Sequence, residues 1–255
     1  MLRGRCGGCG GQARIWAVTS TSSSPADALD RWYHYGTSSA GRRAVGRLYW
    51  DWYQRRGPGD DLLGDLTGRT VAELGAGAGH QAAYVAAELR ARRVIAIDSS
   101  AAQHSRGRGL YEDVPGLDFV HGDAAAYLQD HPSSLDTAYS VFGALDFSDP
   151  RTVLPAAAVA LRPGGTLVFS TLAHYRTGAP PETDCRPADI PTRLPDGSPG
   201  TMRRWVLEPA VWTKLLDEHG FDLVDSDAVH DPGADGESPV ATGLFRARRR
   251  GRRAC

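Results

Sequence analysis

Three glycines and an aspartate with cofactor-binding spacing lie in residues 71–98, which read VAELGAGAGHQAAYVAAELRARRVIAID. Gly75, Gly77 and Gly79 form a GxGxG pattern directly after an apolar run. Such glycines let a ligand approach the backbone where a helix begins and offers free N–H groups. Asp98 ends the next apolar run, a place from which an acid can accept hydrogen bonds from ribose hydroxyls. The stretch therefore predicts a binding loop for a nucleoside-containing cofactor.

The side chains around this loop discriminate between cofactors. The dinucleotide fingerprint GxGxxG requires a glycine where this sequence has His80. Glu73 places a carboxylate beside the loop, which would repel a pyrophosphate and attract an ammonium or sulfonium group. Asp123 follows the third apolar run, where it could accept a hydrogen bond from an adenine amino group and also cap a helix. We therefore expect a cationic adenosine cofactor, with NAD as the disfavoured alternative.

The elements that must position these residues alternate along the chain. Short β-rich apolar runs are followed by helical segments that begin after Gly79, Ser99, Asp123 and Asp149. This alternation is typical of βαβ units and predicts an α/β fold with a doubly wound, mostly parallel sheet. The expected strands are 70–74, 93–98, 117–122, 135–142, 165–171, 221–229 and 240–248, with a further helix at 208–220.

Five segments in this order resemble the motifs of class I S-adenosylmethionine-dependent methyltransferases: VAELGAGAGH, VIAIDSS, GDAAA, LDTAYSVFGAL and LRPGGTLVFST. The resemblance covers roughly residues 70–245. It implies a Rossmann-like, seven-stranded sheet with an antiparallel last strand, S-adenosylmethionine as cofactor and S-adenosylhomocysteine as product. The chain is most similar to the small-molecule branch, which includes ubiquinone, menaquinone and natural-product tailoring methyltransferases, so a methyl group would pass to O, N or C of a small acceptor.

The resemblance also implies roles for individual residues. The loop and Glu73 would surround the methionine moiety, Asp98 would bind the ribose, Asp123 would bind the adenine, and Phe142 would border the methyl group. Aromatic residues cluster before the first strand, and they predict either a cap over the cofactor or the ordinary core of two packed helices. Tyr35, Trp50 and Tyr53 are the candidates for cation–π contact with the sulfonium. The full expected cofactor-binding set is Glu73, Gly75, Ala76, Gly77, Gly79, Asp98, Ser99, Asp123, Ala124, Ser140, Phe142 and Trp50.

A proline-rich insert follows the fifth strand. Six prolines between Tyr175 and Arg203 exclude a regular helix or central strand and predict a lid or substrate insert over residues 174–203. His174 would lie at the pocket and is a candidate general base, although a lone histidine is more often structural. Asp146 follows the fourth strand, but no Asp-Asn pair follows the fifth, so no metal site is expected.

The expected domain organisation has four parts. The leader is rich in Gly and Ser without an acidic residue, which predicts disorder, and the arginine-rich tail is expected to be a solvated, disordered end. The parts are a disordered leader at 1–24, an N-terminal helical cap at 25–60, the S-adenosylmethionine-binding core at 61–247 with the insert at 174–203, and a basic disordered tail at 248–255.

Composition limits the partners. The net charge is −1, and the fourth motif reads SVFG rather than the Asn/Asp-Pro-Pro-aromatic box of amino-methylating nucleic-acid enzymes, so no nucleic acid is expected. The sequence has neither a secretory signal nor an apolar run of about 18 residues or more, so no membrane partner and a cytoplasmic location are expected. A monomer and a homodimer both stay open. Besides the methyltransferase, an NAD-dependent oxidoreductase and a catalytically silent S-adenosylmethionine-binding protein are kept as alternatives.

Overall fold

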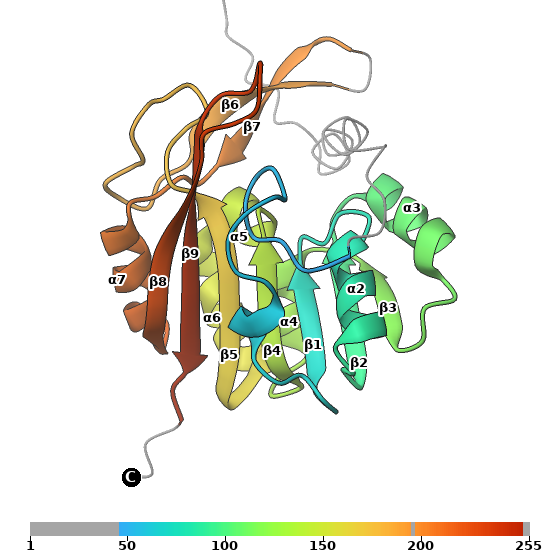
Figure 1. Ribbon diagram of the computed structural model, residues 1–255. Helices are drawn as coiled ribbons and strands as arrows, with labels where there is room; N and C mark the ends of the chain where they lie inside the picture. The colour runs from blue at the N-terminus through green and yellow to red at the C-terminus, as the bar shows by residue number, and fades with distance from the viewer. Residues whose placement is uncertain (1–45, 195–196, 252–255) are drawn as a thin grey trace, which may run out of the picture.

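The computed structural model describes residues 46–194 and 197–251, and its centre is a seven-stranded sheet with helices on both faces (Figure 1). The strand order is β3-β2-β1-β4-β5-β9-β8. The first five strands are parallel, whereas β9 runs antiparallel to both of its neighbours, β5 and β8. The predicted fold class is confirmed. The strands are β1 (Thr70–Leu74), β2 (Arg93–Asp98), β3 (Leu117–His121), β4 (Leu135–Val141), β5 (Leu161–Leu172), β8 (Phe221–Asp231) and β9 (Val240–Arg249).

Capping side chains explain where several helices begin. The side chains of Ser100, Asp123 and Asp149 each accept a hydrogen bond from a backbone N–H in the first turn of the helix that follows. Pro150 occupies the first turn of its helix, where no N–H partner is needed. The helices are η1 (Asp60–Leu63), α2 (His80–Glu88), α3 (Ala101–Tyr111), α4 (Ala124–Asp130), α5 (Ala144–Phe147), α6 (Pro150–Ala160) and α7 (Pro209–Glu218).

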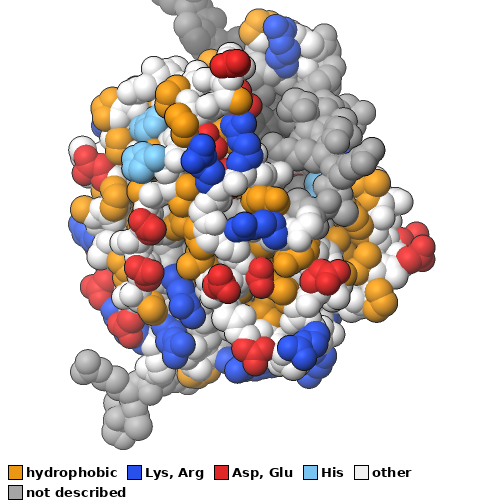
Figure 2. Space-filling view, in the orientation of Figure 1, with side chains coloured by type: hydrophobic (Ala, Val, Ile, Leu, Met, Phe, Trp, Pro, Cys, Tyr) orange, Lys and Arg blue, Asp and Glu red, His pale blue; other side chains and the backbone are white. Residues whose placement is uncertain are grey.

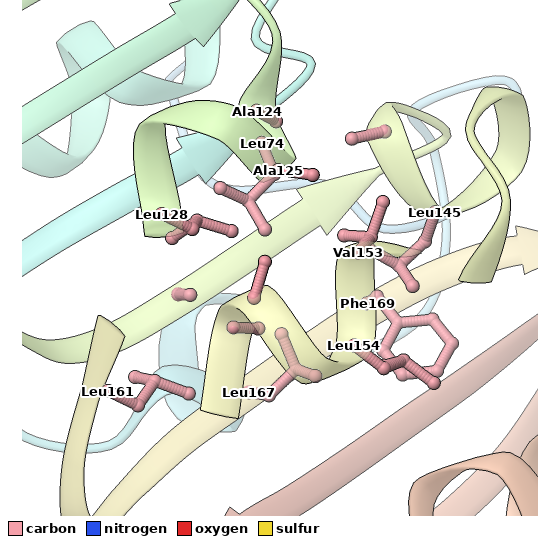
Figure 3. Close-up of a cluster of buried hydrophobic side chains, with 14 of the residues drawn as sticks. Leu74, Ala124, Ala125, Leu128, Leu145, Val153, Leu154, Leu161, Leu167 and Phe169 are labelled. Atoms are coloured by element: carbon pink, nitrogen blue, oxygen red, sulfur yellow. The ribbon is translucent and has the colours of Figure 1, made fainter. Parts of the chain in front are cut away.

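Two apolar layers fix the sheet between its helices. On one face, side chains of β1, β4 and β5 pack against α4, α6 and α7, and Figure 3 shows Leu74, Leu154 and Phe169 in this layer. On the other face, Val71 and Tyr139 pack against α2, η1 and the segment that carries Trp50. Because both faces are covered, β1 is buried along its whole length and β4 along most of its length.

The segment before the sheet differs from its prediction. The helical cap expected over 25–60 is wrong for residues 46–57, which form turns and bends, while residues 25–45 of the cap and the leader lie outside the described residues. Trp50 is fully buried on the sheet. The backbone N–H and C=O of Tyr49 bond to the side chain of Gln81 at 2.8 and 2.7 Å, so an α2 side chain supplies the partners that a helix would have supplied.

The proline-rich insert also contains more regular structure than the sequence predicts. β6 (Ala188–Arg193) and β7 (Pro199–Arg204) form a two-stranded antiparallel hairpin above the carboxyl ends of the parallel strands (Figure 1). Both strands of a two-stranded ribbon are edge strands, where a proline without an N–H is tolerated, and this explains Pro191 and Pro199. The hairpin therefore forms one wall over the end of the sheet where ligands bind in this fold class.

At the other end of the chain, β9 continues past the expected core boundary at residue 247 and includes Arg248 and Arg249. Arg250 then forms ion pairs with Asp217 and Asp222. The first residues of the predicted tail are thus ordered, because sheet pairing and two acidic partners hold them. Residues 252–255 lie outside the described part of the chain. No helix in the described ranges is long and apolar enough to cross a membrane.

Candidate functional site

Two adjoining cavities lie at the carboxyl ends of the parallel strands. The larger has a volume of about 830 Å³ and the smaller about 60 Å³. Gly75, Asp98 and Phe147 line both cavities and so join them. The carboxyl ends of the strands are where ligands bind in open α/β sheets.

The glycine loop between β1 and α2 forms the floor of the larger cavity. Gly75, Gly77 and Gly79 all have positive φ angles, of 77°, 57° and 72°. A Cβ on Gly75 would lie 2.5 Å from the backbone nitrogen of Ala144, and one on Gly79 would lie 2.6 Å from the ring of Phe119. A Cβ on Gly77 would meet no atom within 4 Å. Packing therefore requires the outer two glycines, whereas Gly77 is open to a ligand.

Asp98 fastens this loop to the end of β2. Its Oδ2 accepts a hydrogen bond from the Gly77 N–H at 2.7 Å, and its Oδ1 accepts one from the Ser100 N–H at 2.8 Å. Burial raises the pKa of the Asp98 carboxyl, and the two backbone donors oppose that rise. Each carboxylate oxygen can accept more than one bond, so both can also receive a ligand hydroxyl.

The smaller cavity contains the expected adenine-binding residues. Ser99, Asp123 and Ala124 line it, together with Ile97 and Phe147. Asp123 is exposed, and its Oδ1 accepts a hydrogen bond from the Ala126 N–H at 2.8 Å as the cap of α4. The structure thus brings the ends of β2 and β3 together around one narrow space.

Glu73 and Ser140 lie beneath the site and line neither cavity. Glu73 is 3% exposed and accepts a hydrogen bond from the Tyr139 hydroxyl at 3.2 Å. Burial raises the pKa of Glu73 to about 8, so its carboxyl is mostly protonated near neutral pH, and the negative charge expected from the sequence is suppressed. The Ser140 hydroxyl donates to the Leu74 carbonyl at 2.9 Å.

Trp52 lines the larger cavity, whereas Trp50, the tryptophan singled out in the sequence, does not. The Trp50 indole N–H donates to the Gly59 carbonyl at 2.8 Å inside the core. Trp52 packs edge to face on Phe142, with ring centroids 5.2 Å apart. Phe142 also lines the cavity and has a positive φ of 47°. Helical spacing does not separate the two tryptophans, because the segment forms turns and bends instead of a helix.

His174 lies beside the cavity and does not line it. The Ala241 N–H donates to its Nε2 at 3.2 Å, and its Nδ1 lies 2.9 Å from the Tyr175 carbonyl. The backbone N–H makes Nε2 an acceptor and the carbonyl makes Nδ1 a donor, so the ring is held in one neutral tautomer. Both ring nitrogens are occupied by backbone groups. This arrangement fits a structural role for His174 better than the role of general base.

Four charged residues that the sequence did not indicate line the larger cavity: Asp51, Arg176, Asp189 and Arg204. Asp51 is 1% exposed, and both of its carboxylate oxygens accept from the Arg55 N–H, at 3.1 and 2.9 Å. Arg204 forms a buried ion pair with Asp146. The sequence gives no signal for this cluster, because Asp51 and Arg204 lie 153 positions apart. Only the fold brings them to one cavity.

The acidic residues after β4 are engaged by arginines. Asp146 pairs with Arg204, and Asp149 caps α6 and forms an ion pair with Arg151 at 2.7 Å. Within residues 46–194 and 197–251, no group of three or more His, Cys, Asp or Glu side chains is arranged to hold a metal ion. On the face shown in Figure 2, acidic and basic side chains are interspersed and form no single basic patch.

Comparisons with known proteins agree with this geometry. A family described as a methyltransferase domain matches residues 71–165, which span the glycine loop to the start of β5. A curated relative, the trans-aconitate 2-methyltransferase of Deinococcus radiodurans, is 29% identical over 199 residues, covering 71% of this chain and 72% of the relative.

Two solved structures share the fold. An S-adenosylmethionine-dependent methyltransferase from Mesorhizobium loti superposes with a TM-score of 0.54 at 20% identity, covering 74% of this chain and 94% of that one. DhpI in complex with S-adenosylhomocysteine gives a TM-score of 0.51 at 18% identity, covering 74% of this chain and 80% of that one.

The fold and the paired cavities are those of an α/β protein whose ligand site lies at the carboxyl ends of its strands. The matching domain family, the curated relative and the shared fold together support a class I S-adenosylmethionine-dependent methyltransferase with S-adenosylmethionine as its cofactor.

Proposed function

We propose that this enzyme transfers the methyl group of S-adenosylmethionine to a small-molecule acceptor bound beside the cofactor in the larger cavity. The observation that carries the proposal is the size and continuity of this cavity. Its volume of about 830 Å³ lies near the top of the range of about 300–1,000 Å³ for ligand pockets, and it joins the smaller cavity at Asp98. The relative named for trans-aconitate supports a small acceptor rather than a macromolecule.

The residues suggest how the cofactor would be held. The adenine would enter the smaller cavity between Asp123 and Ala124, and the ribose hydroxyls would donate to Asp98. The methionine part would cross the open face of Gly77. Asp51 would accept from the α-ammonium group, since it is a buried carboxylate that lines the cavity.

Glu73 and Ser140 have a different proposed role from the one expected. Their hydrogen bonds to Tyr139 and Leu74 brace the end of β1, from which the glycine loop departs. They would therefore act on the cofactor through the loop. Trp52 and Phe142 would take the place proposed for Trp50, because their rings lie at the cavity surface and can attract a sulfonium through cation–π contact.

The chain's contribution to catalysis would be chiefly positional. S-adenosylmethionine, when bound, supplies a methyl group that is already activated for displacement. Asp98, Gly77 and Asp51 would fix its orientation, and the aromatic rings with the β6–β7 hairpin would keep the acceptor in line with the methyl group. Holding two reactants in this geometry replaces a bimolecular encounter by a step within one complex, which alone gives a large acceleration.

Calorimetric titration tests the cofactor assignment. We expect saturable binding of S-adenosylmethionine and S-adenosylhomocysteine, and none of NAD, because His80 occupies the third glycine position of the dinucleotide fingerprint. NAD binding alone would favour the oxidoreductase alternative. Cofactor binding without methyl transfer to any member of a broad acceptor panel would favour the catalytically silent alternative.

A matched variant tests the role of Asp51. Asp51→Asn keeps an oxygen that accepts from the Arg55 N–H and removes the charge. We expect the dissociation constant of S-adenosylmethionine to rise about tenfold or more, as for loss of one charge-assisted hydrogen bond. The control ligand is 5′-methylthioadenosine, which lacks the amino-acid part and should bind both proteins equally. Equal weakening for both ligands would show general damage to the site and contradict the assignment.

A further inference from the structure

Two guanidinium groups lie against one indole ring in the larger cavity. The Cζ atoms of Arg176 and Arg204 lie 5.3 and 5.1 Å from the centroid of the Trp52 ring. Arg204 also lies 4.8 Å from the ring of Phe147. All four residues line the cavity. Stacked guanidinium groups are held in plane by such rings, which leaves their N–H edges to bind an anion.

Arg204 has hydrogen-bonding capacity that the described residues leave unused. It is 2% exposed, and its ion pair with Asp146 engages only Nη2, while its buried Nε finds no acceptor in the described part of the chain. A buried donor without an acceptor is costly. Asp146 offsets the charge of Arg204. The exposed Arg176 then contributes the net positive charge of this part of the cavity.

Asp98 and Arg176 lie at different sides of the cavity. Asp98 ends β2, whereas Arg176 follows β5, and strands β1 and β4 lie between them. Asp189, an acid on β6 that also lines the cavity, is exposed, so water screens its charge. The side of the cavity near Asp98 suits a cationic cofactor. The side near Arg176 and Arg204 suits an acceptor that has an anionic group.

The described residues that line the cavity include no His, Lys or Cys, and His174 is held by backbone groups outside the cavity. Of the lining carboxylates, Asp51 and Asp98 are assigned to the cofactor, which leaves the exposed Asp189 as the candidate general base among these residues. Tyr175 donates to Glu182, and burial raises the pKa of its hydroxyl to about 12. A hydroxyl or ammonium acceptor must lose a proton to become a nucleophile, whereas a carboxylate is already ionised near neutral pH.

We propose that the acceptor is a small carboxylate, held by Arg176 and Arg204 against Trp52 and methylated on a carboxylate oxygen to give a methyl ester. This inference rests on the proposed function. A lone pair of the carboxylate oxygen forms the new O–CH₃ bond, the S–CH₃ bond breaks, and its electron pair stays on sulfur. One negative and one positive charge disappear, so the products are a neutral ester group and a neutral thioether, and no proton is transferred.

The experiment is a methyl-transfer assay with S-adenosylmethionine labelled in the methyl group. The panel contains aliphatic di- and tricarboxylic acids and aromatic monocarboxylic acids, each beside its primary amide, together with phenols and primary amines. We expect alkali-labile label, released as methanol, from at least one acid and none from its amide. Alkali-stable label on a phenol or amine, or no label on any acid while S-adenosylmethionine binds, would overturn the inference. Failure of S-adenosylmethionine to bind would instead overturn the proposed function.

Variants of Arg176 test the site itself. Because this side chain is exposed, Arg176→Gln should fold normally. We expect the KM for the labelled acid to rise about tenfold to hundredfold, as for loss of a charged hydrogen bond, with partial rescue in Arg176→Lys and an unchanged dissociation constant for S-adenosylmethionine. Arg193→Gln is the control, because Arg193 is exposed at the end of β6 and does not line the cavity. An unchanged KM in Arg176→Gln, or an equal rise in Arg193→Gln, would contradict the assignment.

Discussion

The side chain of Asp98 is bonded to the backbone N–H of Gly77 at 2.7 Å, so the acid at the end of β2 holds the middle of the glycine loop. The same carboxylate lines both cavities. The position of the loop and the proposed place for the ribose hydroxyls therefore depend on one residue. This hydrogen bond explains why the glycine loop and the acid at the end of β2 occur together in the sequence.

Replacement of this acid should abolish tight cofactor binding. In Asp98→Ala, the ribose would lose up to two hydrogen bonds to a charged acceptor, and the loop would lose its anchor. We expect the dissociation constant of S-adenosylmethionine to rise by a factor of about 100 or more, measured by calorimetry. Asp113→Ala, at an exposed turn, is the control. Affinity within a few fold of wild type would rule out the ribose role.

The glycines of the loop should respond differently to the same substitution. Gly79→Ala places a Cβ 2.6 Å from the Phe119 ring, so we expect a loss of about 1–3 kcal/mol in the free energy of unfolding, measured by denaturant titration. Gly77→Ala meets no atom within 4 Å and should cost only about 1 kcal/mol for its left-handed backbone. Its main effect should be weaker cofactor binding. Equal destabilisation by both would contradict this division.

Glu73 should make the stability of the cofactor-free protein depend on pH. Its pKa is raised from 4.5 to about 8 by burial, so between these values the folded protein binds a proton that the unfolded chain has lost. Stability should therefore fall as pH rises from about 4.5 to 8, by up to about 5 kcal/mol from this group. The pKa of Asp146, raised to about 6, adds a similar trend at lower pH.

The matched variant is Glu73→Gln, which keeps an acceptor for the Tyr139 hydroxyl and cannot ionise. We expect its melting temperature to fall less than that of wild type between pH 6 and pH 8. Thermal unfolding by circular dichroism at several pH values measures the difference. The same dependence of melting temperature on pH in the two proteins would contradict a raised pKa for Glu73.

Loss of the His174 imidazole should affect stability rather than turnover. His174→Gln removes a ring that joins the end of β5 to β9 through Ala241. We expect a cost of about 0.5–1.5 kcal/mol in the free energy of unfolding, as for a typical hydrogen bond, and an unchanged kcat. A kcat reduced a hundredfold at full stability would restore the general-base role.

Several features of the site were predictable from the sequence because they are local. Gly75 and Gly79 are needed where the chain turns from β1 into α2, and Asp98 ends β2 at a fixed distance along the chain. Asp123 caps the helix that it precedes. In each case, the residue type is required by the backbone conformation or hydrogen bonding of its own segment, so periodicity and spacing carry the signal.

The sequence by itself thus determined the class of fold, the seven strands of the main sheet and the glycine loop. Tertiary structure decided which charges share the cavity: Asp51, Arg176 and Arg204 come from three distant segments, and only sheet topology brings them together. It also decided that Trp52 rather than Trp50 faces the cavity and that burial suppresses the charge of Glu73. The physical reason is that burial and the proximity of distant side chains depend on the packing of the whole chain, whereas turn and capping preferences act within a few residues.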